Sequence, residues 1–513
     1  MKKTILTIFT LTITFVCISQ TTKTSSLNSD LMLSEKQMLE DIDSLQNHIK
    51  TAGVHSVLNK YLKGIDLDSH FNTYRKSINK NTTTTEFALM VDQLLNLVQD
   101  GHANLITNKD NFNAIKRHVK RKKLVFDTLA FKYAKIYDDF FETFNPDLEL
   151  PIKYIDGKYF ITVPFKYNNI IFDAGLEVIE CNSQPIAKIL PTLISEVFAM
   201  RWDLKNKTYY KNTFYKAKRF ITQGKINLGF KNKSGRIIRQ EFNFKDRVNL
   251  LKEPVRRIGY FTQNTKKVFY FKKEEILYLR VPKMSRNTKD YYNNKIDSIH
   301  NLYGKISKVV LDIRGNGGGT DRCFTNILKH IVSKPVNQPY KVAFPKNNFS
   351  VSYFDIQPTD NIGVEKNPLL GNTPFYIYEA HKTIKPDSNS INFDGNIFVL
   401  QDEFIFSASG NLSALAKSNS NIITIGNITG KACGNQASPA YFSLPNSKLM
   451  FRLEPMLDFS SVTKIEDIFH DEVTHYLPQT LENYQRQIFS KQDIYSMEFL
   501  RAYDPLFKMV IDY

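Results

Sequence analysis

The C-terminal half of the chain is predicted to form an α/β layer fold, on the basis of three segments. Two apolar, β-branched runs, 308–312 and 396–400, have the composition of buried strands. A helical stretch, 322–332, follows the first of these runs. Strand, helix and strand in this order are typical of helices that pack against the face of a sheet.

The length of the chain predicts several domains. Its 513 residues are too many for one hydrophobic core, so roughly two to four domains are expected. The hydrophobic content of 42% and the 38 phenylalanines indicate well-packed globular structure.

The N-terminus has the pattern of an export signal. Two lysines precede the apolar segment 5–18, which is short for a membrane span but suits the apolar region of a secretory signal. We expect residues 1–19 to be a signal peptide and the mature protein to be periplasmic or extracellular. A cell-surface lipoprotein modified at Cys17 is the alternative, although Val16 stands where such sites carry a small residue. No later segment is long and apolar enough to span a bilayer.

The number and spacing of the cysteines and the distribution of positive charge argue against several classes of function. Cys181, Cys323 and Cys433 remain after the signal, an odd number without CxxC spacing, so neither a disulfide framework nor a zinc site is indicated. The net charge is +18, with the densest positive run at 116–123. No nucleic-acid motif accompanies this run, so a solvated face is favoured over an anionic partner, and no nucleic acid is expected to bind.

Residues 20–145 are predicted to form a helical region. Apolar side chains recur at helical spacing from about Leu31 to Val98, and the turn Asp100-Gly-His102 then interrupts the pattern. His102 is thereby expected to point from a turn into a cleft. A lone histidine is more often structural, so this residue is only a candidate at this point.

Residues 146–250 are predicted to be rich in β-strands, on the runs 159–163, 225–230 and 238–244. The remaining segment, 255–513, contains the predicted α/β core. Before its first buried strand, this core is expected to contain a hairpin over 269–281 and a helix over 291–303.

The strand 308–312 leads into a glycine-rich loop. Four glycines occur within residues 315–319, and consecutive free amides in such a turn form a concave site for an anion. The dinucleotide pattern GxGxxG fails because Thr320 occupies its last position. A phosphate loop of the Walker type fails because no Lys-Ser or Lys-Thr follows.

The strand 396–400 leads to Ser407 at a predicted helix start. Serine is favoured there as a helix cap for reasons unrelated to catalysis. A helix N-terminus also suits a nucleophile, because its amides and dipole stabilise a developing oxyanion.

The glycine loop resembles a known family signature. The sequence Asp312-Ile-Arg-Gly-Asn-Gly-Gly-Gly319 is similar to the Asp-Leu-Arg-x-Asn-x-Gly-Gly motif of the C-terminal processing (tail-specific) serine peptidases, which include the tricorn protease core. The resemblance implies a crotonase-like α/β peptidase core that cuts polypeptides without a metal or other cofactor. It also implies that Ser407 is the nucleophile, by similarity to the motif Ser-Ala-x-Glu, with Ser409 as the fallback and Gly410 in place of the glutamate.

A second resemblance lies in the β-rich region. Residues 174–186 are similar to the Gly-Asp-x-Ile-x-x-Ile-Asn-Gly-x-Pro segment of PDZ-like domains, which bind peptides at a sheet edge. Ser183 stands where glycine is usual, and the Gly-Leu-Gly-Phe loop is missing. Peptide binding and a purely structural β-domain both remain open.

The family uses two kinds of general base, and both have candidates here. Lys431 follows a stretch similar to the family's Gly-x-x-Thr-x-Gly-Lys motif but arrives one residue early. The tricorn-like solution uses a histidine oriented by a glutamate, for which His102 and Glu466 are the candidates, and we prefer it. Backbone amides of Gly317 or Gly318 together with Ala408 are expected to hold the oxyanion.

These features lead to one expected function and one alternative. We expect an exported serine endopeptidase that acts through an acyl-enzyme on unfolded or C-terminal segments of proteins. The alternative is an inactive, peptide-binding relative, suggested by Gly410 and the displaced Lys431. A zinc peptidase is excluded at 470–475, where the two histidines are five residues apart rather than four.

Overall fold

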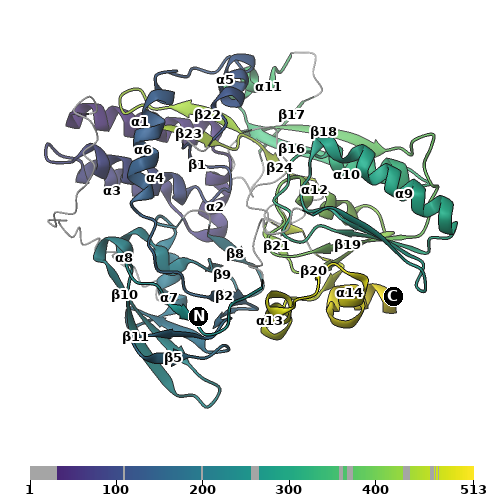
Figure 1. The fold of residues 1–513 in the computed structure, drawn as a ribbon. Coiled ribbons are helices and arrows are strands. Elements are labelled where there is room, and N and C mark those ends of the chain that lie inside the picture. The colour runs from purple at the N-terminus through teal and green to yellow at the C-terminus, as the bar shows by residue number, and fades with distance from the viewer. Residues whose placement is uncertain are drawn as a thin grey trace, which may run out of the picture.

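The computed structural model describes residues 32–513 except 108–109, 198–199, 256–264, 358–361, 367–373, 431–438, 461, 463–466, 468–469 and 472. Figure 1 shows an N-terminal group of helices, a β-rich unit below it and an α/β core beside both. The predicted signal peptide and the cysteines Cys17 and Cys433 lie outside the described residues. Among those described, no helix has both the length and the apolar character needed to cross a membrane.

The N-terminal region is helical, as the sequence predicts, but the run 31–98 is divided into four helices. Ser34 and Thr83 cap two of them with complete capping boxes, each satisfying amides that the first turn leaves free. Two further helices follow the Asp-Gly-His turn. The bounds are α1 Glu35–Ala52, α2 His55–Lys63, α3 Leu67–Ser77, α4 Thr84–Leu97, α5 Phe112–Arg121 and α6 Ala130–Glu142.

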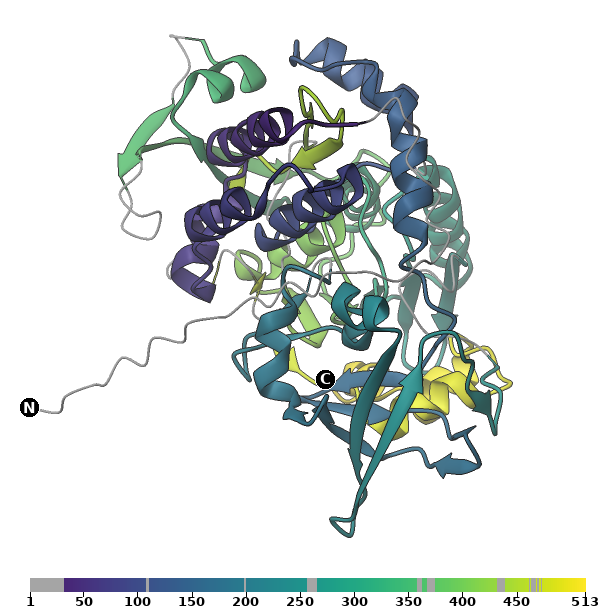
Figure 2. The ribbon, with the colours of Figure 1, turned by 90° about the vertical axis from the view of Figure 1, so that its left-hand side faces the viewer.

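A hairpin from the C-terminal half completes the core of this helical region. Strands β22 (Ala440–Ser443) and β23 (Met450–Leu453) pair antiparallel, and Phe442 and Phe451 pack with Leu45 and Leu94 in one buried cluster. Figure 2 shows this yellow-green hairpin among the purple and blue helices. The short strand β1 (Asn104–Leu105) pairs with β23, so the chain after the Asp-Gly-His turn is held by a segment some 350 residues away.

The β-rich unit has its own aromatic core, which includes Phe165, Phe172, Phe230 and Phe242. Its main sheet has the order β11-β10-β6-β3-β2, with β7 paired to β6. The segment 174–186 forms β6, a tight turn and β7, and Ser183 has a φ of 63°, a conformation that favours the glycine usual in PDZ-like domains. Its kinship to PDZ domains stays a prediction. The bounds are β2 Ile152–Ile155, β3 Lys158–Ile161, β4 Phe165–Tyr167, β5 Ile170–Phe172, β6 Glu177–Cys181, β7 Gln184–Pro185, α7 Ile186–Ile189, β8 Arg201–Asp203, β9 Thr208–Tyr210, α8 Lys218–Gln223, β10 Lys225–Lys231, β11 Ile237–Asn243 and β12 Asn249–Leu250.

The core contains a six-stranded sheet of order β13-β14-β15-β19-β20-β26, parallel except for its first pair. Helices cover both faces: α9, α10 and α12 pack on one, and α14 and α15 on the other. Val309 and Leu311 face the first layer and Val310 the second, which explains why the strand is continuously apolar. Figure 1 shows the yellow helix α14 on the side of the sheet opposite α9 and α10. The predicted α/β layer fold is confirmed.

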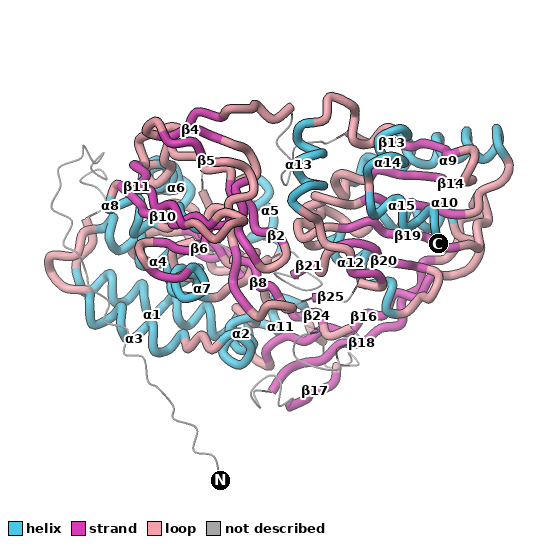
Figure 3. The backbone as a smooth tube through the Cα atoms, turned by 90° about the horizontal axis from the view of Figure 1, so that it is seen from below, coloured by secondary structure: helices cyan, strands magenta, loops and turns pink. Residues whose placement is uncertain are grey.

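The bounds of the core elements complete the description. The central sheet and its helices are β13 Lys267–Phe271, β14 Ile276–Arg280, α9 Lys289–Tyr303, β15 Lys308–Asp312, α10 Arg322–Ile331, β19 Asn396–Gln401, α12 Ala408–Ala414, β20 Ile422–Gly426, β26 His475–Tyr476, α13 Leu481–Phe489, α14 Met497–Tyr503 and α15 Pro505–Asp512. A second sheet, whose strands are magenta in Figure 3, has the order β17-β18-β16-β24. The remaining elements are β16 Val336–Pro345, α11 Asn348–Phe354, β17 Gly363–Lys366, β18 Pro374–Ile384, β21 Thr429–Gly430, β24 Leu457–Asp458 and β25 His470–Asp471.

Candidate active site

The glycine loop and the loop that carries Ser407 leave the same edge of the central sheet. Their strands, β15 and β19, are neighbours and run parallel, so both chains emerge together. The Gly315 amide donates a hydrogen bond to Asp402 Oδ1 at 3.0 Å. The Phe406 amide donates to the Asn316 carbonyl at 3.1 Å. Two segments 90 residues apart in the chain therefore form one cross-linked structure.

Ser407 has a strained backbone. Its φ of 56° and ψ of −125° lie in a region that non-glycine residues rarely adopt. It precedes α12, yet its side chain makes no capping hydrogen bond to that helix. Capping therefore does not explain the serine. Strain of this kind costs about 1–3 kcal/mol and clusters at functional sites, where the surrounding structure enforces it.

Gly318 packs directly against this turn. A Cβ atom on Gly318 would lie 2.4 Å from the Phe406 carbonyl oxygen and 2.7 Å from Ser407 Cβ. Its φ of +93° also disfavours any side chain. This glycine is thus required by close approach as well as by conformation, and the approach brings the glycine loop against Ser407.

Ser409 serves the structure of the turn. Its hydroxyl contacts the Asn316 carbonyl at 2.6 Å and accepts from the Phe406 amide at 2.9 Å, and the side chain is fully buried. These bonds join the glycine loop to the Ser407 turn. The sequence-predicted fallback nucleophile is therefore already engaged between the two loops.

Three amides were predicted to bind an oxyanion, and the three differ in their surroundings. The Gly318 amide donates to Asn316 Oδ1 at 2.8 Å. Ala408 is the first residue of α12, where an amide has no acceptor within the helix. Gly317 lies beside Gly318 on the loop that touches Ser407. The Gly318 amide is thus already engaged, whereas the Ala408 amide has no acceptor within its own helix.

The pairing of β1 with β23 brings His102 to the turn that carries Ser407. The register places Asn104 opposite Arg452, and continuing it by two residues brings His102 opposite Glu454. His102 Nδ1 lies 3.0 Å from Glu454 Oε2. The imidazole also meets the Phe406 ring edge-on, with a centroid distance of 5.3 Å, so it lies beside the residue that precedes Ser407.

Burial controls the protonation of this pair. Burial lowers the pKa of His102 to about 4, opposed by the negative charge of Asp100 and assisted by the positive charge of Arg452. Burial, followed by the charge of Asp100, raises the pKa of the fully buried Glu454 well above its usual value. His102 is therefore neutral near pH 7, which is the form of imidazole that can accept a proton.

A network of buried ion pairs anchors the start of the glycine loop. Arg314 binds Asp312 through Nε at 3.0 Å and Nη2 at 2.6 Å, and its Nη1 lies 2.6 Å from Asp504 Oδ2. Asp504 caps α15 through the amides of Leu506 and Phe507. The signature residues Asp312 and Arg314 thus connect the loop to the C-terminal helix.

The predicted site residues are only partly brought together. The structure joins Ser407, Gly317, Gly318 and Ala408 into one site and brings His102 to its edge. Lys431 and Glu466 lie outside the described residues.

Sequence reasoning missed Glu454, which is the carboxylate that contacts His102. A charged residue between Leu453 and Pro455, in the otherwise apolar stretch 453–457, was the available signal, because a carboxylate there must be buried.

Comparisons with known proteins agree with this description. Residues 275–458 match the model of peptidase family S41. No curated protein matches the sequence. Among solved structures, mature CPAF is similar with 14% identity and a TM-score of 0.56, over 93% of this chain and 98% of that one. Mature CPAF complexed with lactacystin is similar with 13% identity and a TM-score of 0.57, over 93% of this chain and 99% of that one. At this identity the two structures support the fold.

Proposed function

The core of this chain belongs to peptidase family S41, the C-terminal processing serine peptidases, and on that premise we propose that Ser407 hydrolyses peptide bonds through an acyl-enzyme. The observation that carries the proposal is the strained turn at Ser407, which packs on Gly318 beside the ring of His102. A peptidase of this family acts on polypeptides, and we propose unfolded or C-terminal segments as its substrates.

In the proposed mechanism His102 is the general base. Nδ1–H donates to the Glu454 carboxylate, which leaves Nε2 to accept the proton from Ser407 Oγ. Oγ attacks the carbonyl carbon, and the resulting tetrahedral intermediate expels the amine, which takes the proton from Nε2. Water then hydrolyses the ester by the same route and regenerates Ser407.

This mechanism changes the orienting acid that the sequence predicted and keeps the second candidate base open. Glu454 replaces Glu466 as the orienting acid, because it contacts His102 directly. Lys431 remains the alternative base. The amides of Gly317 and Ala408 are proposed to bind the oxyanion, and each such donor contributes about 3 kcal/mol of barrier lowering in serine peptidases.

We further propose export of the protein and a division of labour among its parts. Export is supported by the apolar segment 5–18 after two lysines. The proposed division is a signal peptide over 1–19, a helical region over 20–145 that supplies His102, a PDZ-like unit over 146–250 and the peptidase core over 255–513.

The proposal is tested by incubating the purified protein with casein and a mixed peptide library, beside Ser407→Ala. Cleavage by the unmodified protein and none by Ser407→Ala is the expected result. Equal cleavage by both would remove Ser407 from the mechanism. Peptide affinity without cleavage by either protein would favour the inactive, peptide-binding relative.

A further inference from the structure

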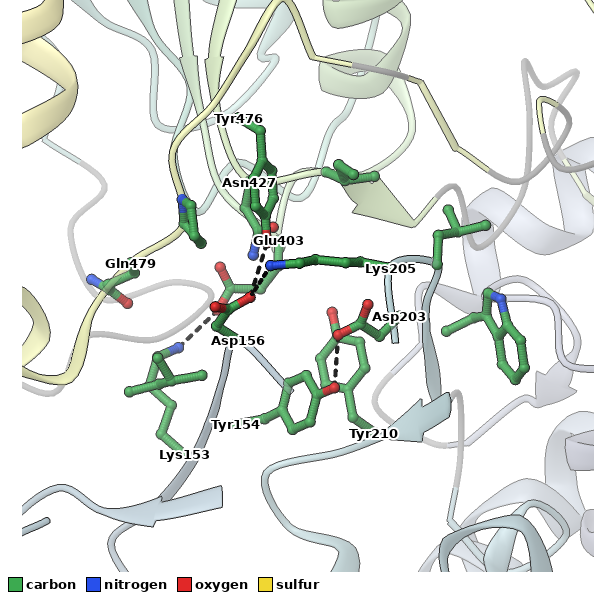
Figure 4. Close-up of a pocket in the computed structure, with 15 residues that line it drawn as sticks. Lys153, Tyr154, Asp156, Asp203, Lys205, Tyr210, Glu403, Asn427, Tyr476 and Gln479 are labelled. Atoms are coloured by element: carbon green, nitrogen blue, oxygen red, sulfur yellow. Dashed lines mark hydrogen bonds and ion pairs between the residues drawn. The ribbon is translucent and has the colours of Figure 1, made fainter. Parts of the chain in front are cut away.

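A buried ion pair connects the β-rich unit to the loop that carries Ser407. Lys153 of β2 lies with its Nζ 2.8 Å from Glu403 Oε1, and both side chains are less than a tenth exposed. Glu403 lies four residues before Ser407 in the chain. Figure 4 shows Lys153 reaching from the β-rich unit toward Glu403 across the edge of a cavity between the two parts.

A second cation from the same unit holds the same loop. Arg201 of β8 donates from Nη1 to the backbone carbonyl of Glu403. Both cations contact the ring of Phe404, whose centroid is 4.8 Å from Lys153 Nζ and 5.3 Å from Arg201 Cζ. Residues 403 and 404 are therefore held by charge, hydrogen bond and aromatic contact at once.

The other side of this loop meets the glycine loop. Asp402 Oδ1 accepts from the amides of Gly315 and Phe404, each at 3.0 Å. The segment 402–406 is thus fixed between the β-rich unit and the glycine loop, and it ends at the strained residue Ser407. A shift of this segment would move the nucleophile relative to the oxyanion donors.

A buried ion pair is a poor device for stability alone. Removing two charges from water costs about as much as their attraction returns, and apolar residues of similar volume are often at least as stabilising. Charges in a buried site fix geometry, however, because each strongly prefers its partner. The Lys153–Glu403 pair lies next to the turn that carries Ser407, so the geometry that it fixes includes the position of the proposed nucleophile.

We propose that Lys153 is a positioning residue for catalysis, which holds Glu403 and thereby sets the position of Ser407. The inference rests on the proposed function of Ser407. It assigns the β-rich unit a part in the catalytic rate itself, separate from any part in binding substrate.

The cavity offers a matched control. Lys205 also lines it, but its ion pair is with Asp156, at 2.9 Å, and that pair is about half exposed. Lys205→Met therefore removes a lysine from the same cavity without releasing Glu403. It is expected to leave kcat unchanged.

The test compares single and double variants by kcat, KM and melting temperature. Lys153→Met leaves Glu403 buried without its cation, so both stability and kcat should fall. The double variant Lys153→Met with Glu403→Met removes both charges, so its melting temperature should recover. Its kcat should nevertheless stay roughly 10–100-fold low, with KM unchanged, because the loop is no longer held. Lys153→Arg keeps the charge and should restore most of kcat.

Opposite results would overturn the inference. A stable double variant with the kcat of the unmodified protein would make the pair structural only. The pair would also be structural only if the kcat of Lys153→Met fell just in proportion to the amount of folded protein. An equal loss of kcat in Lys205→Met would lead to the same conclusion. Ser407→Ala, assayed alongside, separates the two proposals: an active Ser407→Ala refutes the proposed function, whereas an inactive one beside a fully active double variant refutes only the part assigned to Lys153.

Discussion

Replacing Gly318 by alanine perturbs the candidate site by one atom. The new Cβ would lie 2.4 Å from the Phe406 carbonyl oxygen and 2.7 Å from Ser407 Cβ, closer than such atoms approach in proteins. Both contacts are with backbone or with a Cβ, so no flexible side chain can move aside. The φ of +93° adds a conformational cost of about 1–2 kcal/mol for a residue with a side chain.

The glycine loop and the Ser407 turn must therefore separate by about 1 Å to accept alanine at position 318. A misplacement of that size costs roughly 100-fold in the catalytic rate. We expect kcat for a peptide substrate to fall by this factor, with a smaller change in KM, because the reacting atoms move and more distant substrate contacts do not.

Gly410 supplies the control for this experiment. It lies on α12, only three residues after Ser407, and an added Cβ meets no atom of the described residues within 4 Å. Gly410→Ala should leave kcat unchanged and stabilise the protein by up to about 1 kcal/mol, because alanine favours a helix. A Gly318→Ala variant that folds and keeps nearly full kcat would refute the claim that the two loops form one site.

Two further predictions concern the buried carboxylates. Glu454→Gln keeps the shape of the side chain but replaces one carboxyl oxygen by an NH₂ group, which can turn toward His102 Nδ1 and hold the imidazole in the wrong tautomer. We therefore expect kcat to fall by roughly 10³–10⁴-fold with little loss of folded protein; unchanged kinetics would exclude Glu454 from the mechanism. For Asp312, burial alone raises the pKa, but the charges of Arg314 and Arg280 outweigh it and lower the pKa from 3.8 to about 2. Because the folded-state pKa is depressed, the stabilisation is complete above about pH 4 and is lost as the pH falls toward 2, a loss of about 2 kcal/mol in the free energy of unfolding. Denaturant unfolding of Asp312→Asn and the unmodified protein at pH 5 and pH 2 should show the difference between them shrinking by that amount, and a constant difference would contradict the assignment.

The sequence predicted those parts of the molecule whose signals are local. The strand 308–312 is apolar throughout because helices cover both faces of the sheet, and the glycines mark a turn where chain segments touch. Ser407 was predicted as the nucleophile from its similarity to the family motif Ser-Ala-x-Glu at a predicted helix start, a signal contained within a few residues, and its catalytic role stays a prediction.

The parts that the sequence could not supply depend on contacts between distant segments. Glu454 meets His102 only because β1 pairs with β23, and no pattern near either residue specifies that pairing. Lys153 and Glu403 are likewise 250 residues apart, and each alone is an ordinary charged residue in the sequence. The roles proposed for these residues depend on their burial, which the local sequence pattern does not reveal.

The most direct test of the account is the site of covalent labelling by a serine-reactive fluorophosphonate, mapped by mass spectrometry. The account predicts an adduct on Ser407 and none on Ser409, because the Ser409 hydroxyl is engaged between the Asn316 carbonyl and the Phe406 amide. Labelling should be strongly slowed in His102→Ala. An adduct on Ser409, or labelling of Ser407 at the same rate without His102, would contradict it.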